Sequence, residues 1–272
     1  MKALNAFKGF SKALAVAVLC ASSQAFFAPA LSAQELTGYD IAKKADELPT
    51  GTTSAYTATM TLLNKKGAKR VRQVIMRSKD FGDTKKTVLS FTQPKDVAGV
   101  SYLMFDYDDA NKDTDSWLYM PAMKKVRRIS GSSKGDDFMG TDFTYEDMEG
   151  TDLEKYTYNL LGEEMVGSEP CWKVECIAKD KDKKTPRRIV WFSKNSYVTY
   201  KAELYDRQDK LQRTLTCSNI RQIDGYWTTG KMVMENVQTG HSTTLEMTNI
   251  SYDQPLADNL FTVAALEKGT IK

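Results

Sequence analysis

Residues 56–77, YTATMTLLNKKGAKRVRQVIMR, carry an apolar side chain at every second position over their first seven residues. From Tyr56 to Leu62 these apolar side chains alternate with three threonines, which is the period of a strand with one buried face. The residues NKKG at 64–67 supply a turn, and 70–77 return as a second strand. The stretch therefore predicts an antiparallel β-hairpin.

The same period and similar turn signals recur toward the C-terminus, which predicts about a dozen strands at hairpin spacing. One clear helical pattern stands before them at residues 34–48, where Pro49 and Gly51 end it. Because helical patterns between the strands are missing, the fold class is mainly β, a single antiparallel sheet with few short helices. The further strands are expected at 87–92, 101–107, 115–120, 154–161, 171–179, 188–192, 198–205, 211–220, 227–237 and 241–252.

The N-terminus has the pattern of a secretory signal peptide. Three lysines precede an apolar run that is too short to span a bilayer, and the small-residue site LSA follows at 31–33. We therefore expect residues 1–33 to be removed on export to the periplasm, which leaves 34–272 as one domain. Cleavage after Ala25 or Ala30 is the alternative.

The charge of the exported domain is balanced. The whole chain holds 38 Lys and Arg against 35 Asp and Glu, and the first 33 residues contain three of the lysines and no other charged residue. The remainder is formally neutral, so it lacks the excess of basic residues that a nucleic-acid-binding protein uses to displace counterions from phosphates. Strong electrostatic steering toward anionic lipid is disfavoured for the same reason.

Residues for catalysis or for a metal site are scarce. The chain has one histidine, His241, next to a glycine in an expected turn, and it has no CxxC, HxxxH or glycine-rich phosphate loop. We therefore predict no catalytic residues, no metal and no cofactor. Three cysteines remain after the signal peptide, and Cys171 and Cys176 are expected on opposite faces of one strand, so they cannot easily pair. For Cys176 and Cys217, a disulfide and a pair of free thiols are equally compatible with the sequence.

Residues 121–153 form the longest stretch without clear alternation, and a loop of this length in a compact domain is usually functional or mobile. Acidic residues cluster there around aromatic and methionine side chains, and basic residues lie just before them, so the two sets could pair. Paired carboxylates could instead hydrolyse a glycan. The acidic residues are Asp136, Asp137, Asp142, Glu146, Asp147 and Glu149, and the basic residues are Lys124, Lys125, Arg127 and Arg128.

Two segments resemble the outer-membrane lipoprotein-sorting protein family, the LolA/LolB-like group often found beside RND-type exporters. They are WLYMPAMKKVRRIS at 117–130 and FMGTDFTYED at 138–147, and the likeness covers roughly residues 50–265. The resemblance implies a half-open β-barrel made from one curved antiparallel sheet with an N-terminal helix. It also implies an apolar interior that accepts the acyl chains of a lipid or lipoprotein.

The sequence thus predicts a non-enzymatic periplasmic carrier of lipid or lipoprotein acyl chains toward the outer membrane. We expect a monomer that works with an RND-type inner-membrane exporter and contacts the membrane transiently. Lys124, Lys125, Arg127 and Arg128 are the expected contacts to headgroups or an acidic partner. The expected cavity residues, chosen because methionine and aromatic side chains suit flexible chains, are Trp117, Met120, Met123, Phe138, Met139, Phe143, Trp172 and Trp191.

Two rival functions remain. An accessory subunit of the same fold could dock on the exporter without carrying cargo, and it would purify free of lipid. An envelope glycan hydrolase could use the acidic cluster, and it would lose activity when Glu146 and Asp147 are replaced. Charged residues on both faces of expected strands such as 70–77 argue against a barrel embedded in the membrane.

Overall fold

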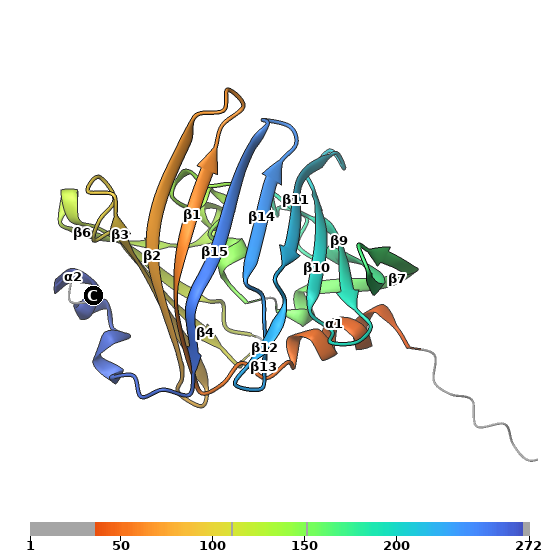
Figure 1. Cartoon of the computed structure of the whole chain (residues 1–272), viewed down its shortest axis with the longest axis horizontal. Coiled ribbons are helices and arrows are strands. Elements are labelled where there is room, and N and C mark those ends of the chain that lie inside the picture. The colour runs from red at the N-terminus through yellow and green to blue at the C-terminus, as the bar shows by residue number, and fades with distance from the viewer. Residues whose placement is uncertain (1–35, 110, 151, 269–272) are drawn as a thin grey trace, which may run out of the picture. The chain divides into compact units, whose positions relative to one another are not determined.

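A computed structural model describes residues 36–109, 111–150 and 152–268. Its main feature is one curved antiparallel sheet of 13 strands, which is not closed because its two edge strands do not pair (Figure 1). The expected signal peptide lies outside the described residues. From edge to edge, the strands are β6 (Lys125–Ile129), β5 (Asp115–Met120), β4 (Ser101–Tyr107), β3 (Thr84–Gln93), β2 (Lys69–Asp80), β1 (Thr53–Leu63), β15 (His241–Tyr252), β14 (Lys231–Asn236), β11 (Leu211–Ser218), β10 (Thr199–Tyr205), β9 (Arg187–Ser193), β8 (Glu169–Ala178) and β7 (Tyr156–Val166).

The sheet consists of two meanders that meet in its middle. The first runs outward from β1 to β6, and the second runs inward from β7 to β15. They join where Met60 of β1 lies opposite Leu245 of β15, so the orange and blue strands are neighbours in Figure 1. The hairpin expected at 56–77 is β1–β2, in which Ala58 faces Val74 across the strands. The predicted mainly β, single-sheet fold is therefore confirmed.

Helices are few and short among the described residues. The helix expected at 34–48 is α1, whose first turn is held by a capping box between Thr37 and Asp40. Gly38 starts it, and a Cβ there would lie 2.9 Å from the backbone of Asn159, so only glycine lets α1 approach β7 this closely.

A separate two-stranded hairpin, β12 (Arg221–Ile223) with β13 (Tyr226–Thr228), precedes β14. The helices are α1 (Gly38–Asp46) and α2 (Val263–Lys268), and the 3₁₀ turns are η1 (Pro121–Met123), η2 (Gly131–Gly135), η3 (Phe138–Gly140), η4 (Glu146–Met148), η5 (Leu153–Lys155) and η6 (Asp258–Leu260).

The stretch expected to be a long loop holds strand β6 and a segment that joins the two sheet edges. This crossing segment, residues 130–155, leaves β6 at one edge and enters β7 at the other. Its buried side chains pack into the apolar cluster on the concave face of the sheet. Phe138 is fully buried there against Phe91, Tyr102 and Tyr145.

Polar contacts also bind the crossing segment to the strands beneath it. The Arg72 guanidinium donates to the carbonyl of Met139 (2.7 Å). The amide of Asp142 donates to Thr243 Oγ1 (3.0 Å), and the Thr243 hydroxyl donates back to the Asp142 carboxylate (2.7 Å). These contacts use side chains from β2 and β15, so the segment is a structured cover over the concave face.

The convex face has a packing cluster of its own. Strand alternation sends Val88, Leu103 and Trp117 to this side, where they pack against Phe261, which precedes α2, and Leu266 of α2. Trp191 points to the same side farther along the sheet, packed with Cys171 and Ile189. Neither tryptophan reaches the concave face, because each lies one position out of phase with the neighbours that do.

The three described cysteines are buried free thiols. Cys171 and Cys176 point to opposite faces of β8, as their spacing predicts. The disulfide considered between Cys176 and Cys217 is not formed. Burial raises the pKa of the Cys176 thiol to about 11, so this side chain stays neutral at physiological pH.

Candidate functional site: an apolar cavity that opens onto a polar one

The concave face encloses an apolar cavity of about 440 Å³ beneath α1 and the crossing segment. Strands β1–β3, β7–β11, β14 and β15 supply its wall, so both meanders contribute. The volume lies within the ~300–1,000 Å³ of pockets that hold one small ligand. Its apolar lining includes Ala42, Tyr56, Ala58, Met60, Val74, Met76, Leu89, Phe143, Met148, Val190, Phe192, Ala202, Leu215, Met232, Met234, Leu245 and Met247.

Of the eight cavity residues expected from the sequence, Phe143 lines this space. Phe138, five residues earlier in the chain, belongs to the filled aromatic cluster. Trp117 and Trp191 face the convex side, so they cannot contact a ligand in the cavity.

The other four expected cavity residues lie around the same cluster without lining the cavity. Met120 and Met139 are partly buried against the cluster, and Met123 is 53% exposed. Trp172 shares the concave face but stacks on Tyr197, with ring centroids 5.0 Å apart. The methionines that line the cavity were visible in the sequence as a stripe on alternating positions. They are Met60, Met76, Met232, Met234 and Met247.

The basic residues at the start of the crossing region form an exposed edge. Lys125, Arg127 and Arg128 lie on the outermost strand β6, and Lys124 precedes it in a left-handed turn with φ of 49°. Arg128 is paired with Asp115. Charged side chains on an edge strand discourage pairing with another sheet, which is a structural role independent of any ligand.

A second cavity of about 480 Å³ adjoins the first and is polar. Nine acidic and five basic residues line it, so its walls carry net negative charge. Seven residues border both cavities and mark the junction between them. These junction residues are Asp46, Glu146, Asp147, Glu149, Leu153, Arg188 and Leu204.

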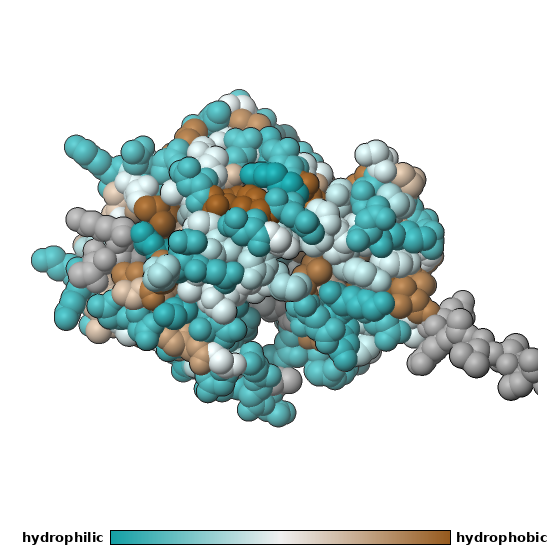
Figure 2. Space-filling model, turned by 60° about the horizontal axis from the view of Figure 1, so that its bottom comes forward, coloured by the Kyte–Doolittle hydropathy of each residue, from teal (hydrophilic) through white to brown (hydrophobic). Residues whose placement is uncertain are grey.

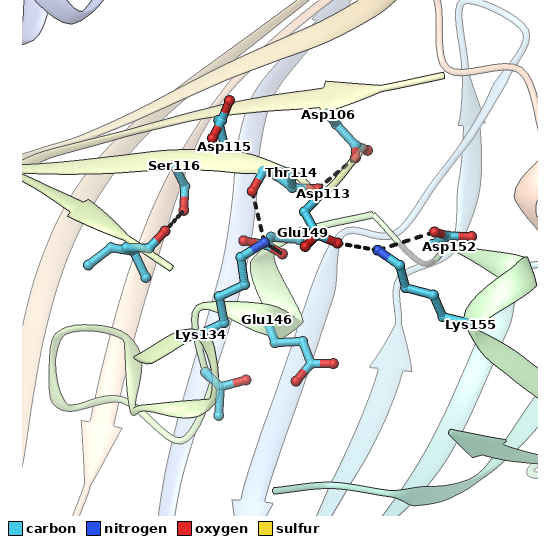
Figure 3. A network of polar contacts seen from close by, with 12 residues as sticks. Asp106, Asp113, Thr114, Asp115, Ser116, Lys134, Glu146, Glu149, Asp152 and Lys155 are labelled. Atoms are coloured by element: carbon cyan, nitrogen blue, oxygen red, sulfur yellow. Dashed lines mark hydrogen bonds and ion pairs between the residues drawn. The ribbon is translucent and has the colours of Figure 1, made fainter. Parts of the chain in front are cut away.

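Most carboxylates of the acidic cluster are already paired, as Figure 3 shows for part of the network. Lys134 donates to Glu149 (2.9 Å) and to the carbonyl of Thr114 (2.8 Å), and Lys155 bridges Asp113 and Asp152. The partners differ from the basic residues that the sequence suggested, since all of them come from outside 124–128. The remaining pairs are Asp136 with Lys184, Glu146 with Lys183, and Asp147 with Arg213.

Two arginines lie in one row on the concave face but have different surroundings. Strand register places Tyr158, Cys176, Arg188, Leu204 and Arg213 side by side across β7–β11. Arg213 is buried, pairs with Asp147 and donates to the carbonyl of the neighbouring Asp142 (2.9 Å).

Arg188 has weaker partners than Arg213. Its guanidinium lies 4.3 Å from the ring centroid of Tyr156. The Asp147 carboxylate, which also acts on it electrostatically, is already paired with Arg213. Among the described residues, no carboxylate lies within ion-pair distance of Arg188. The junction thus holds a cation that lacks a paired anion.

Two buried oxygens at the cavities also lack a hydrogen-bond partner within the described chain. They are the Tyr158 hydroxyl, which faces the apolar cavity, and Oε1 of Glu149 at the junction. Burial raises the pKa of both groups, and the Lys134 ammonium only partly offsets this for Glu149. Buried polar atoms in proteins are nearly always satisfied, so each of these two oxygens can form a hydrogen bond with a group that enters the cavities.

Comparison with known proteins agrees with this architecture. A family model described as an uncharacterized protein matches residues 83–268. A DUF1329 family protein from Desulfovibrio piger is 35% identical, with a TM-score of 0.80 over 84% of this chain and 97% of its own. The chain belongs to the DUF1329 family. No curated protein matches it.

Two further structures relate this DUF1329 protein to lipoprotein-sorting proteins. An outer membrane lipoprotein-sorting protein domain from Vibrio parahaemolyticus is 35% identical, with a TM-score of 0.79 over 85% of this chain and 98% of its own. A LolA superfamily protein from Nitrosomonas europaea is 21% identical, with a TM-score of 0.66 over 84% and 99%. The fold is therefore that of the LolA superfamily, as the resemblance implied, and the prediction of a non-enzymatic protein agrees with these relatives.

The described part of the chain contains two α-helices, α1 and α2. Neither of its α-helices is long and apolar enough to cross a bilayer. Within the same residues, no group of three histidine, cysteine or acidic side chains converges in a way that could hold a metal ion.

Proposed function

We propose that this DUF1329 protein is a non-enzymatic periplasmic carrier that shields a lipid or lipoprotein acyl chain on its way to the outer membrane. The observation that carries the proposal is the apolar cavity inside the curved sheet. An acyl chain in water costs ~25 cal/mol for each Å² of exposed apolar surface, so a carrier has to bury it. The cavity can do this without any chemical step.

The outer surface supports storage inside the sheet. In Figure 2, hydrophilic side chains cover most of the face in view, and hydrophobic ones form separate patches among them. Separate patches of this kind can cover little of an acyl chain, so this face favours storage of apolar cargo in the interior. The name of the Vibrio relative, a lipoprotein-sorting protein domain, points to the same class of cargo.

We further propose an RND-type inner-membrane exporter as the partner, with the chain acting as a monomer that touches the membrane transiently. The exposed cations Lys124, Lys125, Arg127 and Arg128 offer a surface for lipid headgroups or an acidic partner. Replacing these four by glutamine should weaken capture of the exporter from solubilised membranes and leave bound lipid unchanged.

Cargo can be tested by native mass spectrometry of the protein purified from periplasm without detergent. We expect an apolar ligand at near-stoichiometric occupancy. Ala202→Phe, which fills the cavity from β10, should lower occupancy at least several-fold. Met165→Phe adds the same ring at a 57% exposed site on β7 and should leave occupancy unchanged.

A wild-type protein that is empty and stays empty after incubation with lipid would contradict the carrier function. The docking-subunit alternative would then be favoured, provided that the empty protein still co-purifies with the exporter. A glycan hydrolase is disfavoured by the ion pairs of the acidic cluster, which tie Glu146 to Lys183 and Asp147 to Arg213.

A further inference from the structure

The junction between the two cavities has the polarity of an amphiphile binding site. On one side lies an apolar space for a chain, and on the other a polar space lined by charged residues. A ligand that occupied both would place its headgroup beside Arg188, which borders both cavities. The question is which headgroup these walls select.

The side of the junction that holds Arg188 can bind a hydrogen-bond acceptor. The Arg188 guanidinium lies over the ring of Tyr156, and no carboxylate of the described chain lies within ion-pair distance of it. A planar guanidinium in this position suits the oxygens of a phosphate or carboxylate, which it binds with two parallel hydrogen bonds. The unpartnered hydroxyl of Tyr158, two strands away in the same row, can donate to the same group.

The side of the junction that holds the carboxylates can bind a hydrogen-bond donor. Oε1 of Glu149 is buried without a partner on a side chain that is 8% exposed. Asp46 borders the same space, and burial together with the nearby Asp106 carboxylate raises its pKa. The nine acidic and five basic residues of the polar cavity would repel a headgroup that carried negative charge alone.

We propose that the cavity pair binds a zwitterionic phospholipid headgroup, with the phosphate on Arg188 and a primary ammonium toward Glu149 and Asp46. An ethanolamine phospholipid has this order of charges, phosphate next to the tail and ammonium beyond it. The inference rests on the proposed carrier function and names its cargo. The cavity volume of about 440 Å³ suits one chain rather than several, so single-chain lipids are the appropriate probes.

The test compares three C16 probes on delipidated protein by native mass spectrometry, with the two lysolipids below their micelle concentrations and the alcohol at the same concentration. The probes are palmitoyl-lysophosphatidylethanolamine, palmitoyl-lysophosphatidylglycerol and hexadecanol. We expect the ethanolamine lipid to bind about tenfold more tightly than the glycerol lipid, which has the phosphate without the ammonium. Hexadecanol, which has neither charge, should bind most weakly.

Variants assign the effect to the two sides of the junction. Arg188→Gln should lower the affinity for both phospholipids about tenfold and leave the affinity for hexadecanol unchanged. Arg188→Lys should restore part of the lost affinity. Asp46→Asn, at the last residue of α1, should abolish the preference for ethanolamine over glycerol. Arg127→Gln removes an exposed arginine from β6 and is the matched control, with no expected change.

The outcomes separate the inference from the carrier function. If wild type binds all three probes equally, the headgroup site is refuted and the carrier survives. If the glycerol lipid binds as tightly as the ethanolamine lipid while both exceed hexadecanol, the ammonium half is refuted. Binding of none of the three would overturn the carrier function as well. Should Arg188→Gln fail to fold, Asp46→Asn and the wild-type ranking still decide.

Discussion

The two faces of the sheet bury apolar side chains in different ways. On the convex face, α2 closes over Val88, Leu103 and Trp117. On the concave face, the crossing segment fills one part with Phe138 and leaves the neighbouring part open. Phe138 therefore fills one part of the concave face, whereas alanine, leucine and methionine side chains, together with Tyr56, Phe143 and Phe192, border the part that is open to a ligand.

The largest effect is expected at Trp191 on the convex side. Its ring is 1% exposed and lies against the ammonium groups of Lys173 and Lys201. Trp191→Asp removes this packing and buries a carboxylate, which should cost more than ~4 kcal/mol of folding free energy. Thermal unfolding followed by circular dichroism measures it. A variant that kept its stability and lost only bound lipid would indicate that Trp191 contacts the ligand.

The filled part of the concave face should be the next most sensitive. Phe138→Ala would empty a fully buried site packed by Phe91, Tyr102 and Tyr145, and we expect a loss of ~3–5 kcal/mol. Urea denaturation with a constant m-value would measure this loss. A cost below ~1 kcal/mol would mean that the crossing segment is not anchored by its aromatic cluster.

A truncation on the cavity wall should cost less than one in the filled part. Leu245→Ala enlarges a space that already exists, so we expect a loss near the lower end of the ~2–5 kcal/mol range for such changes. The same urea experiment gives the value. The comparison would fail if Leu245→Ala proved as costly as Phe138→Ala.

The smallest effect concerns pH and the junction. Because burial raises the pKa of Glu149 in the folded state, the native protein binds this proton more tightly than the unfolded chain does. Stability therefore falls as pH rises from the ordinary carboxyl pKa of ~4.3 toward the raised value. Glu149→Gln should remove this part of the fall, which is seen as melting temperatures that decline less between pH 4 and 7.

Asp136→Asn is the matched control for this pH effect. The hydrogen bond from Lys184 lowers the pKa of Asp136, so its contribution to stability is present above the ordinary carboxyl pKa and is lost as pH falls. Its substitution should therefore change the pH dependence in the opposite direction. Equal slopes for wild type and Glu149→Gln would show that Glu149 is solvated in solution.

Parts of the fold could be predicted because they depend on local pattern. The alternation from Tyr56 to Leu62 and the turn after it predicted β1 and β2, and the three- to four-residue spacing predicted α1. The crossing segment escaped prediction because its 3₁₀ turns are only three to five residues long and give no period. Strand β6, with five residues, is too short for alternation to identify it.

The site was predicted less well than the fold, for a physical reason. Alternation assigns Trp117 and Leu118 to opposite faces but does not say which face encloses a cavity. That is decided when α2 covers one side and the crossing segment covers part of the other. Among the residues expected to line a cavity, Trp117 and Trp191 therefore lie on the convex side, whereas Phe143 lines the apolar cavity.

The sequence by itself determined the class of fold, the strand order of the first hairpin and the absence of a charge excess after residue 33. These follow from the local period of side chains and from composition. Tertiary structure alone decided that Arg213 is paired and Arg188 is not, and that an apolar and a polar cavity meet beside Arg188. Both outcomes depend on how the crossing segment lies over the sheet, since it brings Asp147 to one arginine and leaves the other beside open space.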